Sequence, residues 1–243
     1  MITLIGTGHV FDLSSAISKI LDEKLPDVIC VELDEQRYNA LMIKLADPDK
    51  YKSAERALPF VYKILARFQD SMAQEYGVTA GDEMLTAIKY AKNHQITVEF
   101  IDMNAQHLFT RMLKNMPFFE KIKLILMSIG GIFVSKKRVE KELRKFENDF
   151  DSYIEEIGKK FPTIKRVLID ERNKYMVQRL VELDKQYEKV VAVIGDGHIP
   201  GISELLNSKE IDFEIIRLRE LRNQDVIPSD TSKASFTVKY KEQ

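Results

Sequence analysis

The fold of this chain is decided by residues 1–9, MITLIGTGH, and by their near copy at residues 190–198, VVAVIGDGH. In each stretch an apolar run typical of a buried strand ends in a Gly-x-Gly-His motif. Glycine lets the backbone turn sharply there, because it lacks a Cβ and tolerates positive φ. We therefore expect the two motifs at the carboxyl ends of neighbouring strands, the edge where open α/β sheets bind ligands.

Five apolar segments are expected to form the sheet: residues 2–5, 28–33, 97–101, 190–194 and 213–218. Most of them are apolar throughout, as in strands that are buried on both faces, and helical patterns lie between them. The sequence thus predicts an α/β fold with a mixed, largely parallel central sheet flanked by helices. Residues 102–188, between the third and fourth core strands, are expected to form a helical insertion or cap.

Residues 1–222, including this insertion, are expected to form a single domain. The tail that follows, residues 223–243, is polar and contains Pro228. Its alternating segment 236–240 is typical of an edge strand.

Composition excludes several classes of protein. The 37 Lys and Arg residues balance 38 Asp and Glu residues, so no nucleic-acid partner is expected. The single cysteine, Cys30, excludes a disulfide framework within the chain. The phosphate-loop glycine patterns are incomplete, so we expect no nucleotide cofactor. The sequence opens without a secretory leader, and its most apolar stretch, residues 124–134, is too short to span a membrane, so a cytoplasmic location is expected.

Four polar residues lie where the expected strands finish: His9, Glu32, Asp102 and His198. Parallel strands would gather them at one edge of the sheet. Two imidazoles with carboxylates suit a divalent transition metal, which could polarise a carbonyl or lower the pKa of a bound water. The alternative is that the histidines satisfy backbone groups and the acids compensate helix dipoles.

A further carboxylate, Glu171, shares one helix face with Ile164, Leu168 and Tyr175. A carboxylate on an apolar face is costly unless it is paired or serves a site. An ion pair of Glu171 with Arg37 or Arg172 is the structural alternative to a role in catalysis. Glu83, one turn into its expected helix, is either a site acid or a surface acid that compensates the helix dipole.

An ordered set of short motifs resembles the TraB family. The motifs are Gly6-Thr7-Gly8-His9, Val31-Glu32-Leu33-Asp34-x-x-Arg37, Gly81-Asp82-Glu83-Met84, Ile101-Asp102, Glu171-Arg172-Asn173-Lys174-Tyr175-Met176 and Gly195-Asp196-Gly197-His198-Ile199-Pro200-Gly201. The resemblance covers residues 1–218. That family includes the PrgY-type pheromone shutdown proteins and is related to the TIKI metalloproteases and the erythromycin esterase-like fold. Two departures are Met103, where relatives often have arginine, and Asn173, where they often have aspartate.

The resemblance implies a metal-dependent hydrolase, a peptidase that acts on a peptide or another small acyl substrate. It implies that His9 and His198 contact a manganese, cobalt or zinc ion. The surrounding polar shell that it implies consists of Glu32, Arg37, Glu83, Asp102, Glu171 and Arg172. In this interpretation Glu32 or Glu171 acts as general base, and Arg37 or Arg172 stabilises the oxyanion.

Two other functions are compatible with the sequence. The same cleft could sequester a short peptide as a regulatory protein without cutting it. Alternatively, the insertion could mediate interactions, because the apolar stretch from Phe118-Phe119 to Val134 is flanked by Lys121, Lys123 and residues 136–138. This stretch predicts a homo-oligomer or a peripheral contact with an anionic membrane, and an ordinary buried helical hairpin is the simpler alternative.

Overall fold

The computed structural model describes residues 1–8, 12–47, 82–123, 155–156 and 158–224. In this part of the chain five strands form one sheet in the order β3-β2-β4-β1-β5, and every pairing is parallel. The strands are β1 (Ile2–Thr7), β2 (Val28–Val31), β3 (Thr97–Phe100), β4 (Val190–Gly195) and β5 (Phe213–Ile216). The predicted α/β fold with a central sheet is confirmed.

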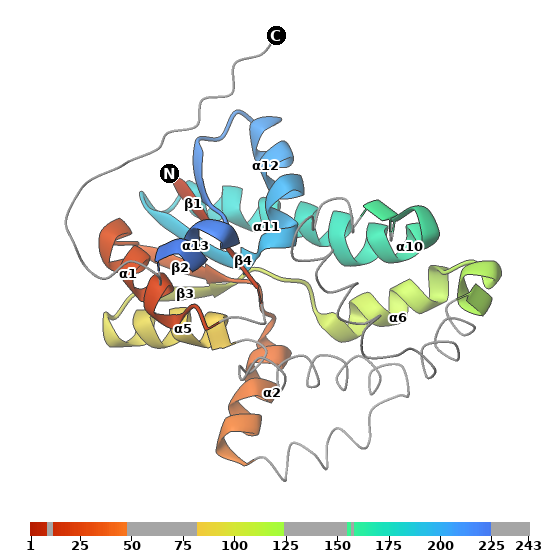
Figure 1. The fold of residues 1–243 in the computed structure, drawn as a ribbon, viewed down its shortest axis with the longest axis horizontal. Helices are drawn as coiled ribbons and strands as arrows, with labels where there is room; N and C mark the ends of the chain where they lie inside the picture. The colour runs from red at the N-terminus through yellow and green to blue at the C-terminus, as the bar shows by residue number, and fades with distance from the viewer. Residues whose placement is uncertain (9–11, 48–81, 124–154, 157, 225–243) are drawn as a thin grey trace.

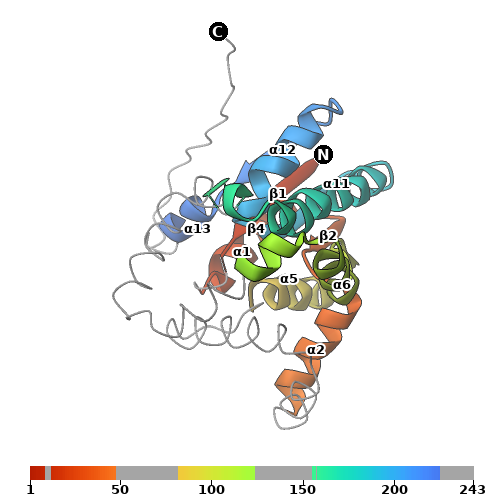
Figure 2. The ribbon, with the colours of Figure 1, turned by 90° about the vertical axis from the view of Figure 1, so that its right-hand side faces the viewer.

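Helices cover both faces of this sheet (Figures 1 and 2). One face carries α1 (Ser14–Lys24), α5 (Asp82–Asn93) and α13 (Leu218–Gln224), and the other carries α11 (Glu171–Asp184) and α12 (Ile199–Asn207). The remaining helices are α2 (Glu35–Ala46), α6 (Ala105–Asn115) and α10 (Pro162–Lys165). A π-helical turn, η1 (Arg166–Asp170), leads into α11, and a 3-10 turn, η2 (Asp196–His198), leads into α12.

The apolar strands supply two core layers because successive side chains of a strand point to opposite faces. Ile5 and Val193 pack toward α1 and α5, whereas Cys30 and Ala192 pack toward α11 and α12. All four are buried. Burial on both faces explains why β1, β2 and β4 are largely apolar rather than alternating.

The strand order places the two glycine motifs at the centre of the sheet. The chain leaves β1 toward β2, but it leaves β4 in the opposite direction, toward β5. In open α/β sheets, ligands bind outside the carboxyl ends of strands at the point where the direction of the connections reverses. Thr7 lies opposite Gly195 in the register, and the Thr7 hydroxyl donates a hydrogen bond to the Ile194 carbonyl at 3.2 Å. The expectation that the two strands leading into the motifs are neighbours is thus confirmed.

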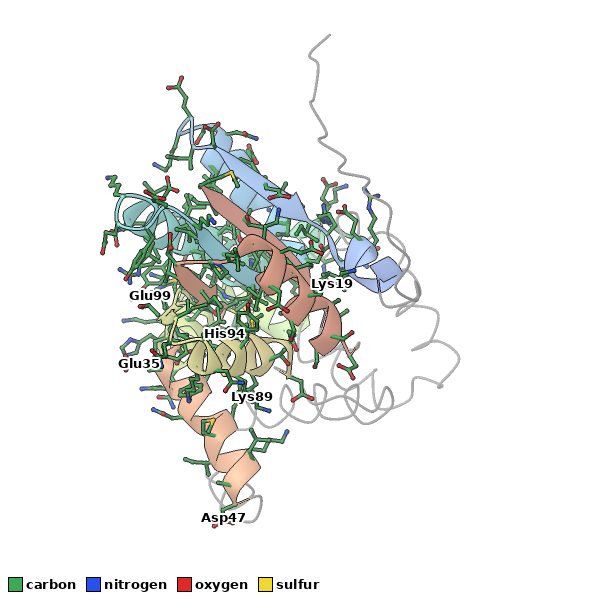
Figure 3. All side chains as sticks on the ribbon, turned by 90° about the vertical axis from the view of Figure 1, so that its left-hand side faces the viewer. Lys19, Glu35, Asp47, Lys89, His94 and Glu99 are labelled. Atoms are coloured by element: carbon green, nitrogen blue, oxygen red, sulfur yellow. The ribbon has the colours of Figure 1, made fainter. Side chains whose placement is uncertain are left out.

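The outward helix faces are polar, as the amphipathic patterns predict. Lys19 on α1 and Lys89 on α5 are both exposed (Figure 3). His94 follows the end of α5, is exposed and stacks on Tyr90 with ring centroids 4.0 Å apart.

Several expectations fall on residues that the structure does not describe. They concern His9, the apolar stretch 124–134 and the edge strand 236–240. The limits of the single domain, 1–222, and of its insertion, 102–188, stay predictions. In the described ranges, no helix is both long and apolar enough to cross a membrane.

The position of Cys30 in the middle of the sheet leads to a chemical prediction. The thiol is fully buried, and burial, followed by the nearby Glu99 carboxylate, raises its pKa, so the reactive thiolate is disfavoured. The thiol of the folded protein should not react with Ellman's reagent. Unfolding in guanidinium chloride should expose it, so that one thiol per chain then reacts. Cys30→Ala serves as the blank, and rapid reaction of the folded protein would contradict the buried position of β2.

Candidate functional site

Arg172, at the start of α11, is the centre of a buried group of ionised side chains beside the carboxyl ends of β2, β3 and β4. Its Nη2 donates to Glu32 Oε1 and, at 2.7 Å, to Asp102 Oδ2, while its Nε donates to Asp102 Oδ1 at 2.9 Å. Its Nη1 donates to the Leu168 carbonyl at 3.2 Å. Burial alone would lower the pKa of Arg172, but the charges of the two carboxylates more than offset that cost and raise it. One guanidinium therefore joins two acids that follow different strands.

Glu32 connects this guanidinium to the second glycine motif. Its Oε2 accepts the Gly195 backbone N–H at 2.6 Å, and its Oε1 lies 3.3 Å from His198 Nε2. Burial would raise the pKa of Glu32, but His198, Arg172 and the Gly195 N–H outweigh it and lower the pKa well below its usual range. Glu32 is thus held as a carboxylate although it is only 5% exposed.

Asp102 is shared by two guanidiniums. Besides Arg172, Arg37 Nη1 donates to Asp102 Oδ2 at 2.7 Å, and the Met103 backbone N–H donates to Oδ1 at 2.7 Å. Arg37 is positioned by the start of α2, where the Asp34 carboxylate caps the helix by accepting the N–H groups of residues 36 and 37. We call the set Glu32, Arg37, Asp102, Arg172 and His198 the Arg172 cluster.

His198 is held at both ring nitrogens. Its Nδ1 lies 2.6 Å from Asn173 Oδ1 and its Nε2 lies 3.3 Å from Glu32 Oε1, so a ring with protons on both nitrogens donates to both oxygens. The contact needs Gly201 on α12, because a Cβ at that position would lie 2.3 Å from Asn173 Nδ2. In the sequence, Asn173 stands out only as a departure from the family pattern, and no local pattern links it to a histidine 25 residues away.

The second glycine motif is also fixed through Asp196. Its carboxylate accepts two hydrogen bonds from the Arg217 guanidinium, at 2.9 and 2.7 Å, and one from the Leu218 N–H at 2.9 Å. The Asp196 carboxylate passes so close to Gly6 that a Cβ there would lie 2.2 Å from Oδ1. The glycine of the first motif thus makes room for the acid of the second.

The described ion pairs of Glu171, one of the predicted site acids, lie outside the Arg172 cluster. Glu171 precedes Arg172 in the chain, yet it pairs with Arg111 and, at 3.8 Å, with Arg166. Among the described residues, the predicted ion pair of Glu171 with Arg37 or Arg172 does not form, and Arg111 and Arg166 are its partners. Glu83 is buried in the first turn of α5, and its role at the site stays a prediction.

The described residues do not make a metal centre by themselves. Within these ranges no three His, Cys, Asp or Glu side chains come together in a way that could hold an ion. Arg172 and Arg37 instead supply the positive charge beside Glu32 and Asp102. His9, the other predicted ligand, lies outside the described residues, so the His9–His198 metal site stays a prediction.

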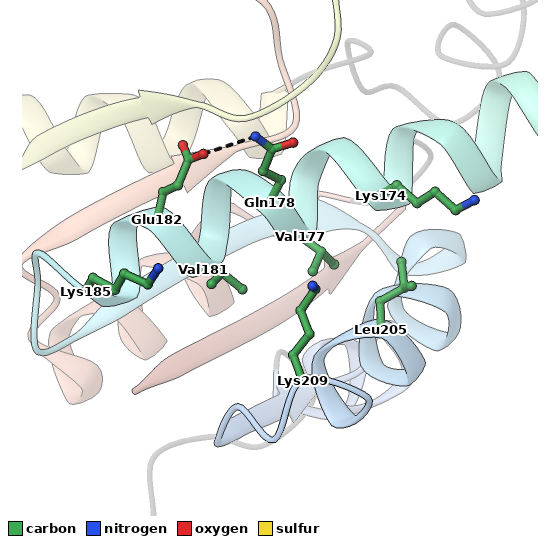
Figure 4. Close-up of a pocket in the computed structure, with 8 residues that line it drawn as sticks. All are labelled: Lys174, Val177, Gln178, Val181, Glu182, Lys185, Leu205 and Lys209. Carbon is green, nitrogen blue, oxygen red and sulfur yellow. Dashed lines mark hydrogen bonds between the residues drawn. The ribbon is translucent and has the colours of Figure 1, made fainter.

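A shallow groove of about 490 Å³ lies between α11 and α12, away from this site (Figure 4). It has an apolar floor and lysines at its rim, and it shares no residue with the Arg172 cluster. The residues that line it are Lys174, Val177, Gln178, Val181, Glu182, Lys185, Leu205 and Lys209.

Comparison with known proteins identifies the family. A sequence model of the TraB/PrgY/gumN family matches residues 1–213. The chain belongs to this family. The matched range contains every member of the Arg172 cluster, so the cluster lies within the TraB domain.

Relatives in this family come from archaea and mammals. The chain is 32% identical over 229 residues to an uncharacterized protein of Methanocaldococcus jannaschii, which covers 90% of this chain and 58% of that protein. It is 25% identical to the TraB domain-containing protein of Mus musculus and 24% identical to that of Homo sapiens, each over 244 residues. Each of these two matches covers 86% of this chain and 64% of the relative. The chain thus spans less than two thirds of the length of these curated relatives.

The shared guanidinium leads to a prediction about stability. Arg172→Ala leaves two carboxylates buried without their common cation and should lower the free energy of unfolding by about 3 to 5 kcal/mol. Arg111→Ala is a matched control, because Arg111 also pairs with a carboxylate but is half exposed. It should cost less than about 1 kcal/mol. Urea denaturation followed by circular dichroism measures both, and equal losses would contradict a central role for Arg172.

Proposed function

We propose that this protein hydrolyses a peptide or a related acyl bond, with His198 transferring the proton. The observation that carries the proposal is the placement of the imidazole between Glu32 at Nε2 and Asn173 at Nδ1, beside two guanidiniums. Membership of the TraB family supports a shared domain and, by itself, no particular reaction.

The proton transfer follows from the hydrogen bonds of the ring. With Nδ1–H donated to Asn173 Oδ1, the ring exchanges its second proton at Nε2, on the side of Glu32, and the neutral ring accepts that proton from a water. The resulting hydroxide attacks the carbonyl carbon, and the imidazolium then returns the proton to the leaving amine or alkoxide as the acyl bond breaks. Glu32, 3.3 Å from Nε2, stabilises that imidazolium.

Arg37 is the better placed of the two guanidiniums to meet the substrate. Its side chain is 35% exposed, whereas that of Arg172 is 14% exposed and already binds both acids. A fixed cation stabilises the negative charge that develops on the carbonyl oxygen in the transition state. Arg172 then acts as a positioning residue that holds Glu32 and Asp102.

The proposal is tested with a peptide library in H₂¹⁸O, followed by mass spectrometry. The wild-type chain should cut a subset of peptides and incorporate ¹⁸O into the new carboxylates. His198→Ala should lower the rate by roughly 100-fold or more, because general acid and base catalysis typically contributes that much. His107→Ala, which changes an exposed histidine of α6, should keep the wild-type rate.

Circular dichroism of each variant separates loss of chemistry from loss of fold. Folded His198→Ala with wild-type activity would refute the role of His198, and no cleavage by the wild type would refute hydrolysis of these peptides. The same reactions with EDTA, or with added Mn²⁺, Co²⁺ or Zn²⁺, test the metal requirement that the family resemblance implies.

One observation favours a second candidate, a protein that binds a peptide without cutting it. Each carboxylate oxygen of Glu32 and Asp102 already accepts a hydrogen bond from the protein, which suits fixed charge rather than proton exchange. In that case mass spectrometry would detect only the uncut peptide after incubation with the protein. Calorimetry would show saturable binding of the peptide in the presence of EDTA.

A further inference from the structure

An exposed apolar patch lies on the helical turn that follows α6. Residues 118–123 are helical, and they lie beyond the end of α6 that is far from the sheet (Figure 1). Phe118 is 70% exposed, Phe119 is 83% exposed and Ile122 is 37% exposed. We call these three residues the Phe118 patch. Two adjacent, largely exposed phenylalanines are unusual on a water-facing surface, and clustered apolar exposure marks a contact site.

The opposite side of the same turn fixes its orientation. An α-helix turns by roughly 100° per residue, so the Phe118 patch occupies about a third of the circumference and Glu120 lies on the other side. The Glu120 carboxylate accepts hydrogen bonds from the Thr163 N–H at 3.3 Å and from its hydroxyl at 3.2 Å. Thr163 is buried on α10, so this contact holds the apolar side of the turn outward.

Positive charge flanks the patch on both sides. Lys121 and Lys123 border it in the helical projection, one on each side. Lys123 is held in place, because its Nζ donates to the Lys160 carbonyl at 3.2 Å and lies 5.1 Å from the centroid of the Phe161 ring. The turn therefore combines an apolar wedge with a cationic rim.

We propose that the Phe118 patch is a peripheral membrane contact that inserts into the headgroup region of an anionic bilayer. An outward apolar face with lysines at its border is the pattern of helices that lie in that interface. A stable protein interface needs roughly 20 to 30 residues on each side, and the described patch offers three apolar side chains. Negative lipid headgroups complement the lysines. This inference is independent of the proposed hydrolysis.

The test is co-sedimentation of the full chain with vesicles. Wild-type protein should sediment with phosphatidylcholine vesicles that contain phosphatidylglycerol and should bind vesicles of pure phosphatidylcholine more weakly. The double variant Phe118→Glu, Phe119→Glu should lower binding by about tenfold or more, since two buried aromatic side chains are lost. Leu45→Glu is the matched control, because Leu45 is 53% exposed on α2, and it should bind like the wild type.

The lysines are tested separately, and self-association is measured in parallel. Lys121→Gln with Lys123→Gln should reduce the preference for anionic vesicles while weak binding to neutral vesicles is kept.

Failure of the wild type to bind anionic vesicles, or full binding by the double phenylalanine variant, would overturn the proposal. Light scattering that shows a dimer abolished by the same variant, without vesicle binding, would instead assign the patch to contact with a second copy of the chain.

Discussion

The pairing of one guanidinium with two buried carboxylates organises the edge of the sheet at the carboxyl ends of β2 and β3. Glu32 follows β2, Asp102 follows β3, and Arg172 comes from α11, so their contact joins the sheet edge to the helix that packs on it. Through Glu32 the same network reaches the Gly195 amide and His198 after β4. Desolvating these charges is expensive, and the geometry is favourable only when all the partners are in place. The cluster therefore gives the edge one defined arrangement.

Glycines surround this network because side chains of neighbouring elements approach the backbone at these positions so closely that a Cβ would crowd them. Gly195 presents its N–H to Glu32, and a Cβ on it would lie 3.1 Å from the carboxylate. Gly6 and Gly201 leave room for Asp196 and Asn173 respectively. A motif that resembles part of a phosphate-binding loop thus serves here to bring side chains from neighbouring elements against the ends of β1 and β4.

The sequence predicted the sheet and the strand-end residues for one physical reason. Strands buried on both faces are apolar throughout, and the carboxyl ends of parallel strands share one edge, which places Glu32, Asp102 and His198 together. The partners of these residues depend on how α11 docks. Arg172 is 140 residues from Glu32, and neighbouring Glu171 points to Arg111, because a step of one residue turns the side chain by roughly 100°. Such pairings have no local signature, and neither does the contact of Asn173 with His198.

A double-mutant cycle tests the central claim most directly. Glu32→Gln, Arg172→Met and the double variant are compared with the wild type by urea denaturation at neutral pH. If the two side chains form one buried ion pair, the losses will be non-additive, with a coupling energy of about 1 to 3 kcal/mol. Losses that add to within about 0.5 kcal/mol would contradict the claim that Arg172 holds the site together.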